Sequence, residues 1–119
     1  MVITIKGILA TLNDHDSANR ANKFAGAKLK KEQTDLVAWQ CKKYGAITNP
    51  VTIDFVWYYS TRHDFDNLAF AKKYCQDGLV KAGVLKDDSQ KFVLGFSDAF
   101  IKVKKGQEKV VMNLIEYES

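Results

Sequence analysis

Four runs of β-branched and aromatic residues most constrain the fold of this chain, because each is too apolar to remain in solvent. They span residues 2–12 (VITIKGILATL), 51–60 (VTIDFVWYYS), 91–103 (KFVLGFSDAFIKV) and 108–118 (EKVVMNLIEYE). Runs of this composition are typical of β-strands. Between the last two runs, the segment KKGQ predicts a hairpin turn.

Two segments between these runs have the spacing of helices. Residues 26–44 and 67–82 repeat apolar side chains every three or four positions, and Gly45 and Gly83 follow them as expected helix stops. Residues 13–25 are polar and lack periodicity, which predicts a loop. The resulting order β-α-β-α-β-β predicts one α/β (α+β) domain over residues 1–119, with helices packed on a mixed sheet.

Composition limits the class of protein further. The 119 residues leave no room for two independent cores, and 46% hydrophobic with 27% charged residues is an ordinary globular mixture. No apolar run is long enough for a membrane span, and Met1 leads directly into the first strand. We therefore expect a cytoplasmic protein without a secretion signal. Cys41 and Cys75 lack metal-ligand spacing and are expected to be reduced thiols on helices.

The charge balance points weakly to a polyanionic partner. There are 18 Lys and Arg against 14 Asp and Glu, a net charge of +4, and only Arg20 and Arg62 are arginines. Lysines suit diffuse contact with phosphates better than reading of base edges. The residues that could contact phosphates are Asn13, Asn19, Arg20, Lys23, Lys28, Lys30, Lys31, Arg62 and Asn67. Taken singly, each lysine of the run 28–31 is better explained as part of a solvated helix face, so the prediction concerns the patch as a whole.

Four aromatic residues could provide stacking platforms for bases. They are Trp39, Trp57, Tyr58 and Tyr59. Their positions in a helix and a strand favour packing in the core or in a dimer interface instead. Tyr58 and Tyr59 must point to opposite faces, because strand side chains alternate.

The residues with the clearest chemical potential are Asp64, Asp66, Asp87 and Asp88. Carboxylates gathered in one place repel one another unless a cation neutralises them, and oxygen ligands favour Mg²⁺ or Mn²⁺ over zinc. The alternative is structural, since Asp before a helix is a common cap and Asp-Asp is common in turns. The second pair can meet the first only if the segment VLKDDS folds back along the helix, or if Asp88 lies where the next strand runs beside the second.

The segment DFDNLAFAKKYCQDGLVKAGVLKDDSQ, residues 64–90, resembles the signature of RusA-like Holliday junction resolvases. That family has D-x-D-N-L, then a helix with a Lys and an Asp-Ala-Leu or Asp-Gly-Leu, then a short turn and D-D. The preceding strand, Asn-bearing loop and basic helix also fit, so the resemblance covers nearly the whole chain.

The resemblance implies a Mg²⁺-dependent endodeoxyribonuclease that acts on four-way junctions as a homodimer in DNA recombination and repair. By position, Asp64, Asp66 and Asp88 match the acidic ligands, Asp87 stands beside the last, and Asn67 matches the motif Asn. The family lysine stands four residues after the second Asp, where this chain has Phe70. Counting back from Asp77 places Lys73 in register, with Lys72 as the competing choice. Such genes commonly belong to phages and prophages of bacteria.

Other functions remain open at this point. Because Phe70 stands where the family has its lysine, the chain could also be a non-catalytic protein that binds branched DNA and has a degenerate acidic site. A small-molecule phosphohydrolase could use the same metal chemistry, although the basic surface argues mildly against it. His63 could contact a phosphate or a water, but a plain turn residue explains it better.

Overall fold

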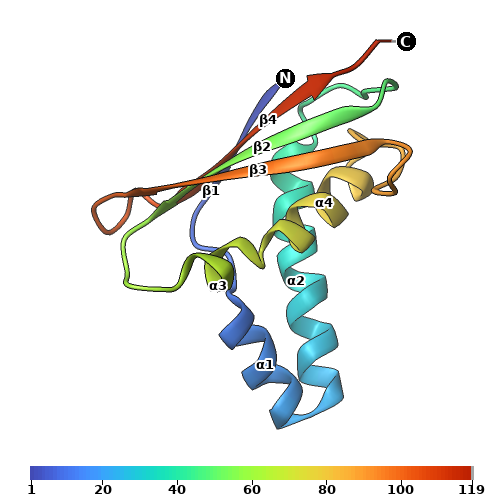
Figure 1. The fold of residues 1–119 in the computed structure, drawn as a ribbon. Helices are drawn as coiled ribbons and strands as arrows, with labels where there is room; N and C mark the ends of the chain where they lie inside the picture. The colour runs from blue at the N-terminus through green and yellow to red at the C-terminus, as the bar shows by residue number, and fades with distance from the viewer. Residues whose placement is uncertain (119) are drawn as a thin grey trace.

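A computed structural model describes residues 1–118, and in it the chain folds into a four-stranded sheet with all helices on one face (Figure 1). The strands are β1 (Val2–Lys6), β2 (Val51–Tyr59), β3 (Val93–Lys102) and β4 (Lys109–Glu116), and the helices are α1 (Leu12–Ala21), α2 (Lys23–Cys41), α3 (Phe65–Ala69) and α4 (Lys72–Lys81). The strand order is β1-β4-β2-β3. Because β2 is parallel to β3 while β4 is antiparallel to β1 and β2, the predicted mixed sheet is confirmed.

The predicted hairpin between the last two strands is wrong. β2 lies between β3 and β4 and pairs with both. The turn itself is tight, since the N–H of Gln107 donates to the carbonyl of Lys104 (3.0 Å) and Gly106 has a φ of +97°. The helical crossover through α3 and α4 has already placed β3 parallel to β2. The turn therefore carries the chain past the end of β2 to its other side.

The N-terminal region differs most from the prediction. β1 stops at Lys6, where Gly7 has a φ of +102°, and α1 replaces most of the predicted loop. A capping box starts this helix: the Thr11 side chain accepts from the N–H of Asp14, whose carboxylate accepts from the N–H of Thr11. Because α1 buries no residue, its sequence lacks the repeat of apolar side chains that predicts a helix. Figure 1 shows α1 and α2 as a hairpin that projects from the sheet.

The predicted helix at 67–82 is two helices with a break at Phe70 and Ala71. The ring of Phe70 packs edge-on against Tyr74, with centroids 5.8 Å apart, and against His15 at 5.1 Å. The break thus turns an aromatic side chain inward between α1 and α4. Gly83 ends α4 as predicted, with a φ of +80°.

The core lies between the sheet and the helices α2 and α4. Alternate residues of β2 face the helices and are buried. The largest buried side chains include Ile3, Ile5, Phe55, Tyr74, Leu79, Met112 and Leu114. Gly78 lets α2 and α4 approach closely, because a β-carbon there would lie 2.4 Å from Cγ1 of Val37.

Both cysteines are free and buried on helices, as predicted. Burial raises the pKa of the Cys41 thiol to about 11. Burial, with a smaller contribution from Cys41, also raises the pKa of Cys75. Neither thiol is therefore poised for chemistry at neutral pH. Within residues 1–118, no helix combines the length and apolar character that crossing a membrane requires.

Candidate functional site

Asp64 and Asp66 lie where β2 leads into α3. Asp64 directly precedes the helix, with φ −67° and ψ 143°, and Asp66 is in its first turn. The backbone carbonyl of Asp64 accepts from the N–H groups of Asn67 and Leu68, but its carboxylate does not cap the helix. Both side chains are exposed, and within residues 1–118 neither forms a salt bridge. Two unpaired carboxylates therefore face solvent at one end of the sheet.

The structure gives Asn67 a different role from the expected DNA contact. It is only 9% exposed. Its Oδ1 accepts from the backbone N–H of Asn13 (2.9 Å), and its Nδ2 lies 3.3 Å from Nδ1 of His63. Asn67 thus fastens the start of α1 to α3 and to the loop before it. This link holds the segment that carries Asp64 and Asp66 in place.

Asp87 and Asp88 lie in the exposed segment between α4 and β3. The Asp87 carboxylate accepts from the backbone N–H of Ser89 (3.1 Å), as expected for the structural, turn-forming alternative. Asp88 is exposed beside it. One member of this pair therefore stabilises its own turn, whereas the other has its carboxylate in solvent.

A single chain does not bring the two acidic pairs together. Asp64 and Asp66 follow the C-terminal end of β2, whereas Asp87 and Asp88 precede the N-terminal end of β3. Because these strands are parallel, the pairs lie at opposite ends of a nine-residue strand, roughly 25 Å apart along it. Among residues 1–118 no three Asp, Glu, His or Cys side chains are grouped to hold a metal ion. The expected four-carboxylate cluster is therefore not formed within one chain, and its residues do not fit a Mg²⁺ site there.

Lys72 is held against the sheet. Its Nζ lies 2.6 Å from Oδ2 of Asp98 and 4.9 Å from the centroid of the Phe96 ring. The indole Nε1 of Trp57 donates to the other oxygen of Asp98 (2.9 Å). The sequence analysis missed Asp98, because a single Asp in a strand gives no signal that it pairs with a lysine on a distant helix. These contacts make Lys72 a structural residue.

The side chain of Lys73 is more accessible to a ligand than that of Lys72. Its side chain is 54% exposed, and its Nζ lies 3.8 Å from the Asp77 carboxylate one helical turn later. A pair this long in solvent contributes little stability. Of the two lysines considered for the family position, Lys73 is thus the one that can reach a ligand.

Glu108 holds the loop between β2 and α3 in place through hydrogen bonds. Its carboxylate accepts from the Ser60 hydroxyl (2.5 Å) and from the backbone N–H of Gly106 (2.8 Å). The Ser60 hydrogen bond is the main cause of a lowered pKa of Glu108. This contact ties the turn after β3 to the segment that leads to Asp64. Sequence analysis missed Glu108, which it placed in the last strand without a role.

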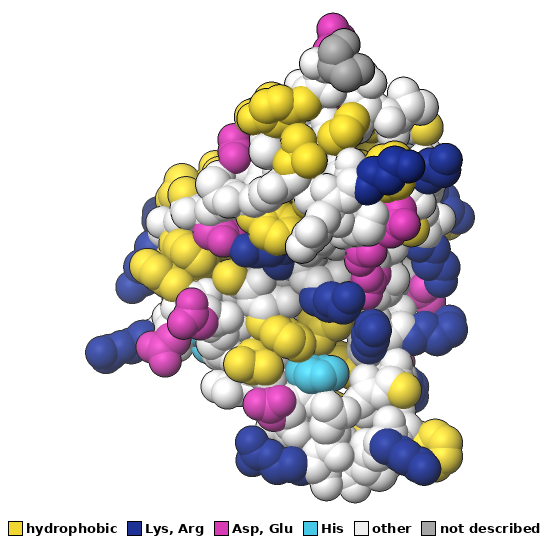
Figure 2. Space-filling model, turned by 45° about the vertical axis from the view of Figure 1, so that its right-hand side comes forward, with side chains coloured by type: hydrophobic (Ala, Val, Ile, Leu, Met, Phe, Trp, Pro, Cys, Tyr) yellow, Lys and Arg dark blue, Asp and Glu magenta, His cyan; other side chains and the backbone are white. Residues whose placement is uncertain are grey.

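Most of the residues predicted to contact DNA are exposed, but they differ in their surroundings. Asn19, Arg20, Lys23, Lys28, Lys30, Lys31 and Arg62 are all at the surface. Lys28 and Lys31 pair with acidic residues one helical turn later on α2. Figure 2 shows Lys and Arg interspersed with Asp and Glu over the face drawn, without one dominant basic patch. Asn19 packs against Gly26, where a β-carbon would lie 1.6 Å from its Oδ1.

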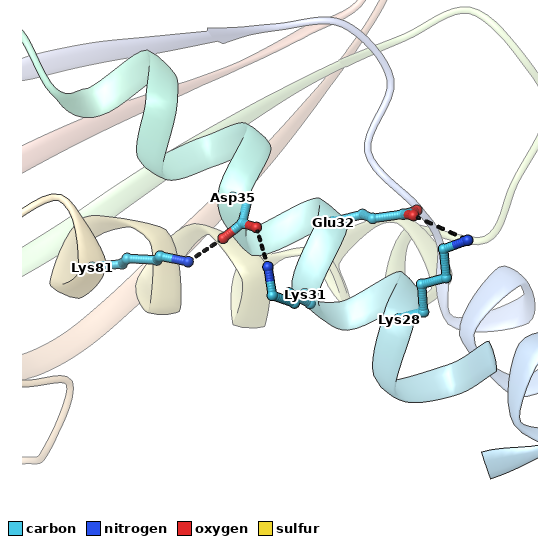
Figure 3. A network of polar contacts seen from close by, with 5 residues as sticks. All are labelled: Lys28, Lys31, Glu32, Asp35 and Lys81. Carbon is cyan, nitrogen blue, oxygen red and sulfur yellow. Dashed lines mark hydrogen bonds and ion pairs between the residues drawn. The ribbon is translucent and has the colours of Figure 1, made fainter. Parts of the chain in front are cut away.

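Lys31 belongs to a network that joins two helices (Figure 3). Asp35 on α2 pairs with Lys31 (3.0 Å) and with Lys81 on α4. The hydrogen bond from Lys81, followed by that from Lys31, lowers the pKa of Asp35. The network therefore links α2 to α4 as long as the Asp35 carboxylate is ionised.

The lowered pKa predicts how this link depends on pH. An acid whose pKa falls on folding stabilises the folded state above its ordinary pKa and loses that contribution as pH falls through the folded value. We expect Asp35→Asn to lower the melting temperature at pH 7, with the difference from the wild type shrinking below about pH 4. Thermal unfolding of both proteins from pH 7 to pH 3 measures this. A difference that stays constant down to pH 3 would contradict it.

A small, partly open cavity lies near the acidic loop, among Leu9, Trp57, Tyr59, His63 and Leu68, among other residues. It holds about 60 Å³, which is room for a few waters only, so it does not offer a substrate site. In comparisons with known proteins, no family model matches the chain and no curated protein is significantly similar to it.

Proposed function

We propose that the protein is a RusA-like endodeoxyribonuclease that cuts four-way and other branched DNA with Mg²⁺. The observation that carries the proposal is the exposed, unpaired Asp64 and Asp66 at the end of β2, in a loop held by Asn67 and Glu108. Exposed carboxylates kept in a fixed loop are suited to a ligand rather than to stability. A bound Mg²⁺ would activate water and stabilise charge on the phosphate.

The proposal requires a second copy of the chain. The acidic pairs lie at opposite ends of parallel strands, so one chain presents only half of the proposed ligand set at each end. A two-fold related copy that lies antiparallel to the first would place its Asp87 and Asp88 near Asp64 and Asp66 of the other. A homodimer then has two equivalent sites, as paired cuts in two strands of a junction need.

The edge of β3 is the surface that we propose for this dimer. β3 is a ten-residue edge strand whose far side pairs with no other strand among residues 1–118. It exposes Leu94, Phe96 and Ile101. A long, apolar edge of this kind is prone to pair with another strand. Antiparallel pairing of two β3 strands would join the sheets and reverse one copy relative to the other.

The roles proposed for Lys73 and for the DNA-contacting residues follow from the exposure of their side chains. Lys73 is proposed to stabilise charge on the reacting phosphate, since Lys72 is engaged by Asp98. The proposed DNA contacts are Asn13, Asn19, Arg20, Lys23, Lys28, Lys30, Lys31 and Arg62. Arg20 and Lys23 lie at the tip of the α1–α2 hairpin, where α1 ends and α2 begins. That tip could reach the DNA arms beside the branch point.

A junction-cleavage assay tests the proposal. The protein is incubated with an immobile four-way junction and with linear duplex of the same sequence, in Mg²⁺ and in EDTA. We expect paired nicks in the junction with Mg²⁺ only, and no cuts in the duplex. Junction binding without cleavage in Mg²⁺ or Mn²⁺ would instead favour the second candidate, a branched-DNA binding protein. That candidate agrees with the absence of a grouped set of metal ligands among the described residues 1–118.

A further inference from the structure

Trp39 is exposed on the surface of α2. Its side chain is 70% exposed, whereas Trp57, the other tryptophan, is 4% exposed. An indole in solvent leaves a large apolar surface without a partner. The prediction of core or interface packing holds for Trp57 within this chain, but the fold gives Trp39 no packing role.

A shallow hollow beside Trp39 is lined by polar and basic side chains. It measures about 430 Å³ and is lined by Thr4, Lys6, Trp39, Gln40, Lys42 and Lys43, with no acidic residue of the described chain. Gln40 fixes its floor, because its amide exchanges hydrogen bonds with the backbone of Lys6 (2.8 and 3.1 Å). The Nζ of Lys42 lies 4.7 Å from the centroid of the indole ring.

The other side of Trp39 is also open and basic. A second hollow of about 300 Å³ runs along Asp35, Ala38, Trp39, Lys42, Lys81 and Ala82. Its acid, Asp35, is paired with Lys31 and Lys81. Trp39 therefore stands between two hollows that carry more cations than anions, with Lys42 over its ring and 70% of the residue exposed.

We propose that Trp39 is a stacking platform for an unpaired base of single-stranded nucleic acid, with Lys6, Lys42 and Lys43 contacting its phosphates. Aromatic faces between lysines are how proteins bind single strands without reading sequence. A duplex keeps its bases stacked on one another and would contact only the lysines. The site uses none of the proposed nuclease residues, so it does not depend on the proposed function.

A second copy of the chain is a poor occupant for this surface. A two-fold contact places a patch against itself. Here that would bring Lys6, Lys42 and Lys43 of both copies together around the two indoles, which like-charge repulsion disfavours. A phosphate backbone carries the negative charge that these lysines attract.

Tryptophan fluorescence tests the proposal directly, without nuclease activity. The full chain is titrated in EDTA with (dT)20 and (rU)20, whose relative affinities tell DNA from RNA as the ligand. We expect quenching of the exposed Trp39 emission in the wild type. Because Trp39→Ala lacks this reporter, affinities of the variants are measured by anisotropy of the same oligonucleotides carrying an end label; we expect a Kd raised about tenfold by Trp39→Ala and a shallower salt dependence in Lys42→Gln. Phe24→Ala is the matched control, since Phe24 is an exposed aromatic (76%) beside Lys23 and outside the hollow.

Three results would overturn the proposal. The first is equal affinity of Trp39→Ala and wild type for both oligonucleotides. The second is equally tight binding of an abasic oligomer of the same charge, which would show that no base stacks. The third is conversion of a wild-type dimer to a monomer by Trp39→Ala in light scattering, which would make Trp39 an interface residue. Because all readouts are made without Mg²⁺, failure of the nuclease proposal leaves them unchanged.

Discussion

A mixture of Asp66→Asn and Asp88→Asn proteins should cut four-way junctions, although each variant alone should be at least about 100-fold slower than the wild type. The reason is the separation of the acidic pairs at opposite ends of β2 and β3. In a mixed dimer, one site receives Asp66 from one copy and Asp88 from the other, while the second site lacks both. Random mixing should therefore restore about one quarter of the wild-type rate.

The complementation experiment has clear controls. Junction binding measured in EDTA should be unchanged or tighter in Asp66→Asn, because the substitution removes a negative charge near the DNA. Glu118→Gln removes one exposed charge that belongs to neither acidic pair, and this variant should cut normally. If the mixture stays as inactive as its components while both variants bind junctions, the site is not shared between copies and the dimer arrangement proposed above is wrong.

Gly78→Ala should destabilise the protein by about 1–3 kcal/mol, although alanine is the better helix former. Replacing Gly by Ala inside an open helix usually gains about 1 kcal/mol. Here the new β-carbon would lie 2.4 Å from Cγ1 and 2.6 Å from Cβ of Val37, and 3.0 Å from the backbone nitrogen of Ala38. Because these atoms belong to the facing helix, α2 and α4 must move apart, which loosens the core around Leu79.

Urea unfolding of Gly78→Ala measures this loss. Gly26→Ala is the matched control, since its β-carbon meets Oδ1 of Asn19, the end of a flexible exposed side chain that can rotate away. It should cost clearly less. Val37→Ala removes the clashing Cγ1 but keeps Cβ, so in the Gly78→Ala background it should be less harmful than in the wild type. A Gly78→Ala protein as stable as the wild type would show that the helices are not in close contact.

The sequence was most informative where one face of an element is buried. β2, β4 and the helix α2 are of this kind, and their observed bounds lie within a few residues of the predicted ones. β3, in which only Val93 is buried, was predicted from its apolar composition. α1 was missed because it buries nothing, so no apolar repeat exists to detect. Its capping box, Thr11 followed three positions later by Asp14, was the available signal.

Strand pairing and the candidate site depend on contacts that local patterns do not encode. KKGQ does form a tight turn, but whether the flanking strands pair is decided by the crossover that places β3 beside β2. The same parallel arrangement separates Asp64 from Asp88: β3 does run beside β2, but Asp88 precedes its N-terminal end, so neither of the two predicted ways for the pairs to meet is realised within one chain. The sequence favoured Lys73 over Lys72 by register alone, and it is the partner Asp98 on β3 that distinguishes the two in the structure.

The pairing of the first strand with the last has a consequence for how the chain is made. The only strand that β1 pairs with among residues 1–118 is β4, with Ile3 beside Met112, so β1 leaves the ribosome long before its strand partner does. The central strand β2 likewise waits for both of its neighbours, since β3 and β4 follow it in the chain. Folding of the sheet is thereby delayed until β4 has been made, and no fragment that lacks β4 can complete it.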